Sequence, residues 1–303
     1  MDDLEKIIKV YNHVFIKQIN KIQKTLETQN MDDSAKNNLN ASGDLLIKIV
    51  KLMQKGEIIV ALPCLRNVYE MTLIAIVLED NKEIFDLYNK MLDEEKRSMM
   101  SKVRFFIGKN LNKYFCVFND NGELKKYLGD GILTYLYHCL CRLAHATKVN
   151  EVVYLAQKDT ELWKSICNFF TIFLIYPMIM VYIDAVYTKI GRGYVSQEIS
   201  GVFTVGIILV LLVIKNDNKL MDSLKNINKH MCNIVDESCF KDMDSQKELA
   251  QKYINDMQNL MSNNGIDEGK LNLQINKLGK FFSEQQKEEL IEIFLKEIVN
   301  TVN

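Results

Sequence analysis

Two groups of ionisable side chains lie in apolar stretches of this sequence, at spacings that suit chemistry. Arg66 and Glu70 stand four residues apart in LRNVYEMTLIAIVL, and His138, Arg142 and His145 follow about seventy residues later. Removing a charge from water costs several kcal/mol unless the charge is paired. These five residues are therefore the first candidates for a functional site.

Arg66 and Glu70 lie about 40° apart on one face of a predicted helix, because each residue turns a helix by about 100°. We expect that face to point inward, since it also carries four apolar residues: Ile59, Leu62, Leu73 and Val77. The two side chains can bond to each other, yet a guanidinium keeps donors for a third partner. Two interpretations stay open. The pair is either a buried structural ion pair, or a site in which Arg66 binds an anion and Glu70 orients a base.

The later group belongs to a helix that is predicted to be amphipathic. Tyr135, His138, Arg142 and His145 fall within about 80° of one another, opposite a row of leucines. This face is either solvated or chemically active. A histidine can take the 2′-hydroxyl proton of RNA or protonate the leaving oxygen, and an arginine can stabilise charge on the phosphate. These groups, with a tyrosine able to stack on a base, suit a metal-independent ribonuclease.

Other motifs are absent or have a structural explanation. His138 and His145 are about two turns apart, too far to share an ion directly, so we expect no metal site. We find no glycine-rich phosphate loop, no nucleophile elbow and no H-E-x-x-H helix, and we expect no cofactor. The GRG run at residues 191 to 193 is interpreted as a helix terminator.

The stretch LRNVYEMTLIAIVL, followed by a helix ending in CRLAHATKVN, resembles bacterial helical proteins related to the HEPN superfamily over about residues 40 to 190. The resemblance implies a helical bundle, frequently dimeric, and a metal-independent RNase of a toxin and antitoxin pair or of phage defence. It also implies Arg142 and His145 as the catalytic pair, with Arg66, Asn67 and Glu70 in support. The HEPN motif places four to six residues between Arg and His, whereas two separate this pair.

The composition of the chain indicates which partners and which cell compartment to expect. Lysine plus arginine (38) nearly balances aspartate plus glutamate (39), so the overall charge does not steer nucleic acid toward the chain. The seven cysteines form no C-x-x-C pair, which is typical of a reduced interior. The opening MDDLEKIIKVYNHVF lacks the pattern of a signal peptide. We therefore expect a cytoplasmic protein.

Apolar residues recur at helical spacing along most of the chain, which predicts an all-α multi-helix bundle of about ten helices. Polar residues from Thr28 to Asn40 are predicted to end the first helix, and Gly56 to separate the second from the third. The expected helices cover residues 4 to 26, 42 to 55, 57 to 79, 83 to 109, 132 to 149 and 160 onward, with polar helices beyond 215. We divide the chain into an N-terminal helix (1–40), a core with the candidate site (41–215) and a polar C-terminal region (216–303).

Two uncharged runs form a predicted, very apolar central hairpin. Residues 165 to 183 and 199 to 214 carry no charge, and a membrane span needs about 20 mostly apolar residues. The centre of a large soluble bundle has the same composition. Polar residues within both runs favour a buried soluble hairpin, and a membrane hairpin is the alternative.

Three hypotheses on function follow. The first is an RNase-type effector or toxin of a bacterial anti-phage or toxin-antitoxin system, acting on RNA as a homodimer under the control of an antitoxin or defence partner. The second is a non-catalytic regulatory or interaction protein whose charged residues form a structural network. The third is a defence effector that disrupts membranes with the apolar hairpin.

Overall fold

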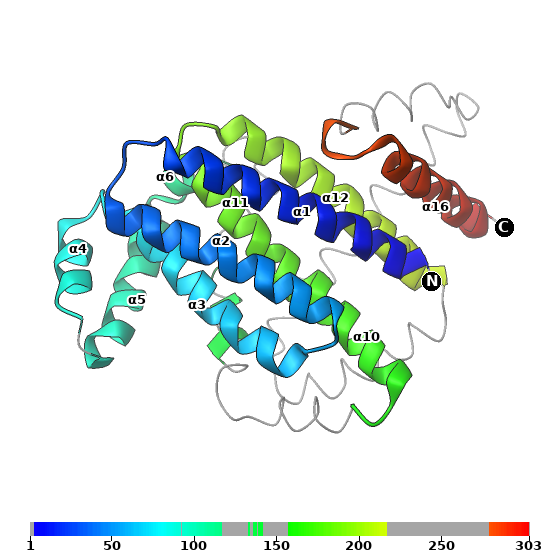
Figure 1. Ribbon diagram of the computed structural model, residues 1–303, viewed down its shortest axis with the longest axis horizontal. Coiled ribbons are helices and arrows are strands. Elements are labelled where there is room, and N and C mark those ends of the chain that lie inside the picture. Colours follow the sequence, from blue (N-terminus) through cyan, green and yellow to red (C-terminus); the bar gives the residue numbers. More distant parts are fainter. Residues whose placement is uncertain are drawn as a thin grey trace. The chain divides into compact units, whose positions relative to one another are not determined.

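The computed structural model describes residues 3–91, 93–116, 133, 136, 137, 139–141, 157–216 and 279–302 (Figure 1). Within these residues the protein contains ten α-helices and no strand, which confirms the predicted all-α multi-helix fold. The helices are α1 (Asp3–Glu27), α2 (Asp33–Gln54), α3 (Ile58–Val77), α4 (Lys82–Asn89), α5 (Asp93–Lys109), α6 (Leu111–Tyr114), α10 (Thr160–Phe170), α11 (Tyr176–Lys189), α12 (Gly193–Asn216) and α16 (Glu284–Val302). A π-helical turn, Thr171–Ile175, joins α10 to α11, and a short 3₁₀ turn, Gly279–Phe281, precedes α16.

The chain forms two compact units. One consists of Met1–Val14 and Glu198–Asn303, and the other of Phe15–Gln197. All the described candidate site residues belong to the second unit. The predicted domain limits at residues 40 and 215 stay predictions.

The second helix begins earlier than the sequence pattern predicted, at Asp33 rather than near residue 42. The Asp32 side chain accepts a hydrogen bond at 3.0 Å from the backbone N–H of Ala35 and so caps the helix. Ala35 and Leu39 are fully buried. The predicted start near residue 42 is therefore wrong, because the few buried residues of the polar run suffice to anchor a capped helix.

Two glycines end helices as predicted. Gly56 has a φ of 75°, its N–H donates to the Met53 carbonyl, and the next N–H, of Glu57, donates to Leu52. This paired arrangement closes α2 and requires a left-handed residue, which glycine adopts without a steric penalty. Gly191, at a φ of 72°, closes α11 with the same hydrogen-bond pattern.

The single helix predicted for residues 83 to 109 is wrong, because α4 and α5 are separate helices there. Ile84 is the buried residue of α4, whereas α5 buries a later stripe: Met99, Met100, Val103 and Ile107. On one straight helix this stripe would be turned by about 100° from Ile84. A break after Asn89 lets both helices bury their apolar side chains.

The helix predicted from residue 160 does begin at Thr160, and it continues through the π-helical turn into α11. In that turn the N–H of Tyr176 donates to the carbonyl of Thr171, five residues earlier. Pro177 follows directly and has no N–H of its own. The wider turn accommodates the proline ring, which would clash with the preceding turn of a regular helix.

Helices α2, α3 and α11 lie side by side in the second unit (Figure 1). The buried Tyr182 hydroxyl on α11 donates to the Leu39 carbonyl on α2 at 3.1 Å. Gly43 allows this approach, since a Cβ at that position would stand 2.8 Å from the same hydroxyl oxygen. This close packing holds α3, which carries Arg66 and Glu70.

In the first unit, contacts converge on the start of α1. The buried Tyr11 hydroxyl donates to the Val202 carbonyl at 2.7 Å, and its ring meets Phe282 edge to face. Asp3 pairs with Lys296 of α16. The hydrogen bond from Lys296 lowers the pKa of Asp3 despite partial burial.

Candidate functional site

The sequence nominated residues on two helices, and the structure describes only part of them. Arg66, Asn67 and Glu70 lie on α3. The other four, Tyr135, His138, Arg142 and His145, lie outside the described residues. The described part of the site therefore consists of α3 and of the residues that flank those four in the chain.

Arg66 and Glu70 form the predicted pair, with Nε and Oε1 2.8 Å apart. Their side chains are 22% and 25% exposed, so the pair is half-buried rather than fully inside, which corrects the expected inward position. Two features explain the difference. Ile59, on the same face, is 43% exposed, and Asn67 is exposed, so this side of α3 lies at the margin of the core. The hydrogen bond from Arg66 to Glu70 raises the pKa of the guanidinium.

A helical segment beyond residue 132 meets α3 directly. Its described residues 133, 136, 137 and 139–141 are helical, and Leu133, Leu136 and Leu140 are buried as predicted. The Tyr69 hydroxyl on α3 donates to the Leu133 carbonyl at 2.9 Å. The ring centroids of Tyr69 and Tyr137 are 6.0 Å apart. These contacts place Leu133 and Tyr137 against α3, and Tyr137 directly precedes His138 in the chain.

Arg104, on a third helix, contacts Tyr137. It projects from α5, and its guanidinium carbon lies 3.8 Å from the centroid of the Tyr137 ring. Sequence reasoning missed this residue. The signal was present, because Arg104 interrupts the apolar run VRFFIG in the way that Arg66 interrupts α3. We call the five residues Arg66, Glu70, Arg104, Tyr137 and Cys141 the tyrosine-arginine cluster.

The tyrosine at the centre of this cluster is a hydrogen-bond donor at neutral pH. Burial raises the pKa of Tyr137, and its hydrogen bond to Cys141 raises it further, while Arg104 and Arg66 act in the opposite direction. Burial likewise raises the pKa of Tyr69 well above its usual range. Both hydroxyls therefore stay protonated.

The cluster is suited to holding an anion. Its two guanidinium groups and one carboxylate leave one net positive charge beside aromatic rings. Arginine binds phosphate or carboxylate through parallel N–H donors, and partial burial strengthens such bonds. Across the described part of the chain, no three His, Cys, Asp or Glu side chains are grouped to hold a metal ion.

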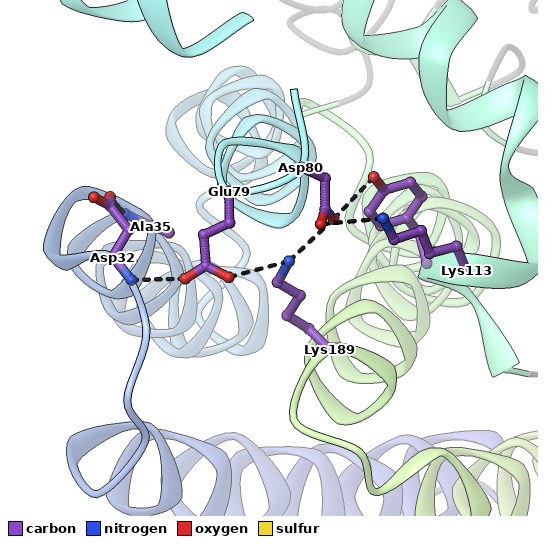
Figure 2. Close-up of polar contacts among 7 residues, drawn as sticks. Asp32, Ala35, Glu79, Asp80, Lys113 and Lys189 are labelled. Carbon is purple, nitrogen blue, oxygen red and sulfur yellow. Dashed lines mark hydrogen bonds and ion pairs between the residues drawn. The ribbon is translucent and has the colours of Figure 1, made fainter. Parts of the chain in front are cut away.

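A second polar network lies at the C-terminal end of α3 (Figure 2). Lys189, near the end of α11, is placed between Glu79 at 3.2 Å and Asp80 at 3.1 Å. The other oxygen of the Glu79 carboxylate accepts the backbone N–H of Asp32 at 2.6 Å. These bonds join the start of α2 to the ends of α3 and α11.

Asp80 extends this network to α6. Its carboxylate pairs with Lys113 at 3.1 Å and accepts the Tyr114 hydroxyl at 3.0 Å. Burial opposes the charge on Asp80, but the hydrogen bonds from Lys113 and Lys189 outweigh it and lower the pKa of the carboxyl. The charged groups of Glu79, Asp80, Lys113 and Lys189 in Figure 2 are paired with one another, so the network stabilises the helix ends rather than presenting a reactive group.

Comparison with known proteins identifies no relative. No protein-family model matches the chain, and no curated protein or solved structure matches it significantly. The resemblance to HEPN proteins stays a prediction.

Proposed function

We propose that this protein is a metal-independent RNase-type effector or toxin of a bacterial anti-phage or toxin-antitoxin system. One observation carries the proposal. Arg104 from α5 lies over the Tyr137 ring, Tyr137 is hydrogen-bonded to Cys141, and Arg66, paired with Glu70 on α3, acts on both electrostatically. Cys141 directly precedes Arg142 in the chain. The cluster proposed to bind an anion thus ends, in the chain, directly before Arg142, the first residue of the predicted catalytic pair.

The proposed reaction is an internal transfer at phosphorus. One of the two histidines, His145 or His138, removes the 2′-hydroxyl proton, and the 2′ oxygen attacks the phosphorus. The bond from phosphorus to the 5′ oxygen breaks, and the other histidine protonates the leaving oxygen. Arg142 stabilises the charge on the phosphate oxygens. Arg66, Asn67, Glu70 and Tyr135 act in support.

The direct test is RNA degradation by the purified full chain in EDTA. We expect cleavage, and we expect Arg142→Ala combined with His145→Ala to abolish it. Arg192→Ala is the matched control, because Arg192 is exposed in the turn before α12 and its loss removes the same charge elsewhere. Cleavage that persists in the double variant, or that requires a divalent metal, contradicts the proposal.

A non-catalytic interaction protein is the second candidate. The observation that favours it is that Arg66 and Glu70 pair with each other, while the guanidinium of Arg104 lies over the Tyr137 ring. Such a network can serve stability alone. In that case Arg66→Ala with His145→Ala lowers the melting temperature but leaves a cellular toxicity phenotype intact, whereas the RNase proposal requires its loss from a variant that is still folded.

A membrane effector is the third candidate. Among the described residues, Ile58–Leu78 and Leu162–Lys189 are long and apolar enough to cross a membrane. However, 78% of the apolar window of the second helix is buried inside the protein, as in the core helix of a soluble bundle. Fractionation of expressed protein separates the two cases, since a spanning helix needs detergent for extraction. In the RNase proposal the protein is cytoplasmic, dimeric and held by an antitoxin or defence partner.

A further inference from the structure

Exposed lysines gather on the outer faces of α1 and α2, within the compact unit Phe15–Gln197. Three lie on α1, two lie on α2, and one is the C-cap residue of α2: Lys17, Lys21, Lys24, Lys48, Lys51 and Lys55. Because each residue turns a helix by about 100°, each set of three falls within about 60° of its helix. We call these six residues the lysine surface.

The outer faces of α1 and α2 are neighbours. Gln23 on α1 donates from Nε2 to the Asn40 carbonyl at 3.1 Å and to the Asp44 carboxylate at 2.8 Å, both on α2. A Cβ at Gly43 of α2 would stand 3.1 Å from the Ile19 side chain of α1. The two helices therefore pack against each other in antiparallel directions, as Figure 1 shows. The two sets of lysines thus belong to one surface.

The positive charge of the lysine surface is not neutralised by neighbouring carboxylates. In the part of the chain that the structure describes, none of the six lysines forms an ion pair, in contrast to Lys113 and Lys189. Residues 15–26 contain no acidic residue, and residues 40–55 contain one, Asp44. Like charges three and four residues apart on a helix repel each other. The surface is therefore suited to a partner that carries several negative charges in a row.

A phosphate backbone suits this surface better than a lipid bilayer does. A helix that lies in a membrane interface inserts Trp, Phe or Leu side chains beside its basic residues. Among the described residues, the exposed large apolar side chains lie on α3, α5 and α12, and none lies on α1 or α2. Lysine supplies a point charge that binds phosphate without requiring a planar geometry. The lysine surface thus offers charge without an apolar anchor.

We infer that the lysine surface holds the phosphate backbone of an RNA strand, independently of its base sequence. The choice of RNA rests on the proposed RNase function. The lysines lie on α1 and α2, whereas the tyrosine-arginine cluster is built from α3, α5 and residues 137 and 141. The surface therefore adds affinity for the strand and takes no part in proton transfer.

Binding is measured apart from cleavage, so that the two proposals fail separately. The probe is a single-stranded RNA oligonucleotide with 2′-O-methyl groups, which cannot undergo the internal transfer. Fluorescence anisotropy gives its affinity for the full chain at several salt concentrations. Each phosphate contact releases counterions from a single strand, so the logarithm of the binding constant should fall with the logarithm of salt with a slope of about −0.7 per contact. Six contacts predict a slope of about −4.

Two triple variants remove half of the surface each. One replaces the α1 lysines and the other replaces Lys48, Lys51 and Lys55, in both cases by glutamine. Each should weaken binding at least about tenfold at about 0.1 M salt and make the slope shallower by about 2. Replacing the α1 lysines by arginine should change the affinity by less than about threefold, because the charge is retained.

A matched control removes the same charge from other helices. It replaces three exposed lysines in or next to α4 and α5 by glutamine: Lys82, Lys90 and Lys109. This variant should change the affinity by less than about threefold, since screened charges away from the strand contribute little. Sedimentation with vesicles of equal parts phosphatidylcholine and phosphatidylserine tests the membrane as the partner.

Selective loss of RNA binding in the two glutamine triples supports the inference, even if the protein cleaves no RNA. Equal losses in the control overturn it, and so does vesicle binding without RNA binding. Cleavage of RNA by a chain whose glutamine triples bind as tightly as the unaltered protein overturns the inference and leaves the RNase proposal standing. If one triple does not fold, the other decides. If neither folds, a slope of the unaltered chain steeper than about −3 supports the inference, and a shallower one overturns it.

Discussion

At the scale of single residues, two arginines on different helices act electrostatically on one tyrosine and are held in different ways. Arg66 is paired with Glu70 on its own helix, whereas the guanidinium of Arg104 lies over the Tyr137 ring. The first arrangement consumes a donor and the second leaves one unsatisfied. The two arginines therefore differ in their hydrogen bonding, although both interrupt apolar runs in the sequence.

The ion pair between Arg66 and Glu70 should contribute modestly to stability. Because both side chains are about one quarter exposed, solvent screens their attraction. We expect a double-mutant cycle with Arg66→Met and Glu70→Gln to give a coupling of about 0.5–1 kcal/mol in urea unfolding. The exposed pair of Lys102 and Glu83 provides a control that should couple more weakly. Equal coupling in both pairs contradicts the assignment of partial burial.

Asp80 should make stability depend on acid pH. Its pKa is lower in the folded protein than in the unfolded chain, so its contribution is complete above the unfolded value of about 3.9. The contribution is lost as pH falls from there through the folded pKa. Asp80→Asn should therefore lower the melting temperature at pH 7, and the difference from the unaltered protein should shrink below about pH 4.

Melting temperatures between pH 3 and pH 7 measure this effect. Asp86→Asn is the control, because Asp86 is exposed on α4. A difference between Asp80→Asn and the unaltered protein that stays constant across this range contradicts the prediction.

At the scale of the elements, α3 is positioned by close contacts on one side and exposed on another. Glycines at 43 and 56 permit these contacts, through the approach of α11 to α2 and through the tight turn into α3. The turn could be predicted from the sequence, because a glycine between two apolar periodic stretches has few other roles. The approach at Gly43 could not, because it depends on which helix becomes the neighbour of α2.

Replacing Gly43 should show that stability depends on the close approach of α11 to α2. Alanine raises helix propensity by about 1 kcal/mol, yet its Cβ would lie 2.8 Å from the Tyr182 hydroxyl oxygen. We expect Gly43→Ala to destabilise the protein. The effect should be smaller in a Tyr182→Phe background, because the contacting oxygen is then gone. Urea unfolding of the four proteins measures the coupling, and strict additivity contradicts the proposed contact.

Contacts within one helix could be predicted from the sequence, whereas contacts between two helices could not. The pair of Arg66 and Glu70 follows from a spacing of four residues. The contact of Arg104 with Tyr137 and the bonds of Lys189 to Glu79 and Asp80 join residues that are far apart in the chain. The sequence can mark Arg104 as a charge in an apolar run, but no local spacing predicts its partner. The break between α4 and α5 was readable in principle, because the apolar stripe changes its phase there.

At the scale of the whole molecule, two helices belong to both compact units. α1 runs from Asp3 to Glu27 and α12 from Gly193 to Asn216, so each crosses a unit boundary without a break in its helical hydrogen bonding. Helix formation is cooperative along a continuous segment. We therefore expect the two units to unfold together.

The single tryptophan allows this to be tested. Trp163 lies in the unit Phe15–Gln197 and reports its unfolding by fluorescence. Gly206→Val perturbs the other unit, because a Cβ there would stand 2.5 Å from the Tyr11 ring. We expect this variant to lower the midpoint of the Trp163 transition and of the loss of helical circular dichroism by the same amount. Gly191→Ala is a control of the fluorescence response, since it strains a left-handed residue within the unit that contains Trp163 and should lower the midpoint by itself. The prediction is contradicted if Gly206→Val leaves the midpoint of the Trp163 fluorescence transition unchanged and the helical circular dichroism is lost in two phases. The continuity of α1 and α12 then does not couple the unfolding of the two units.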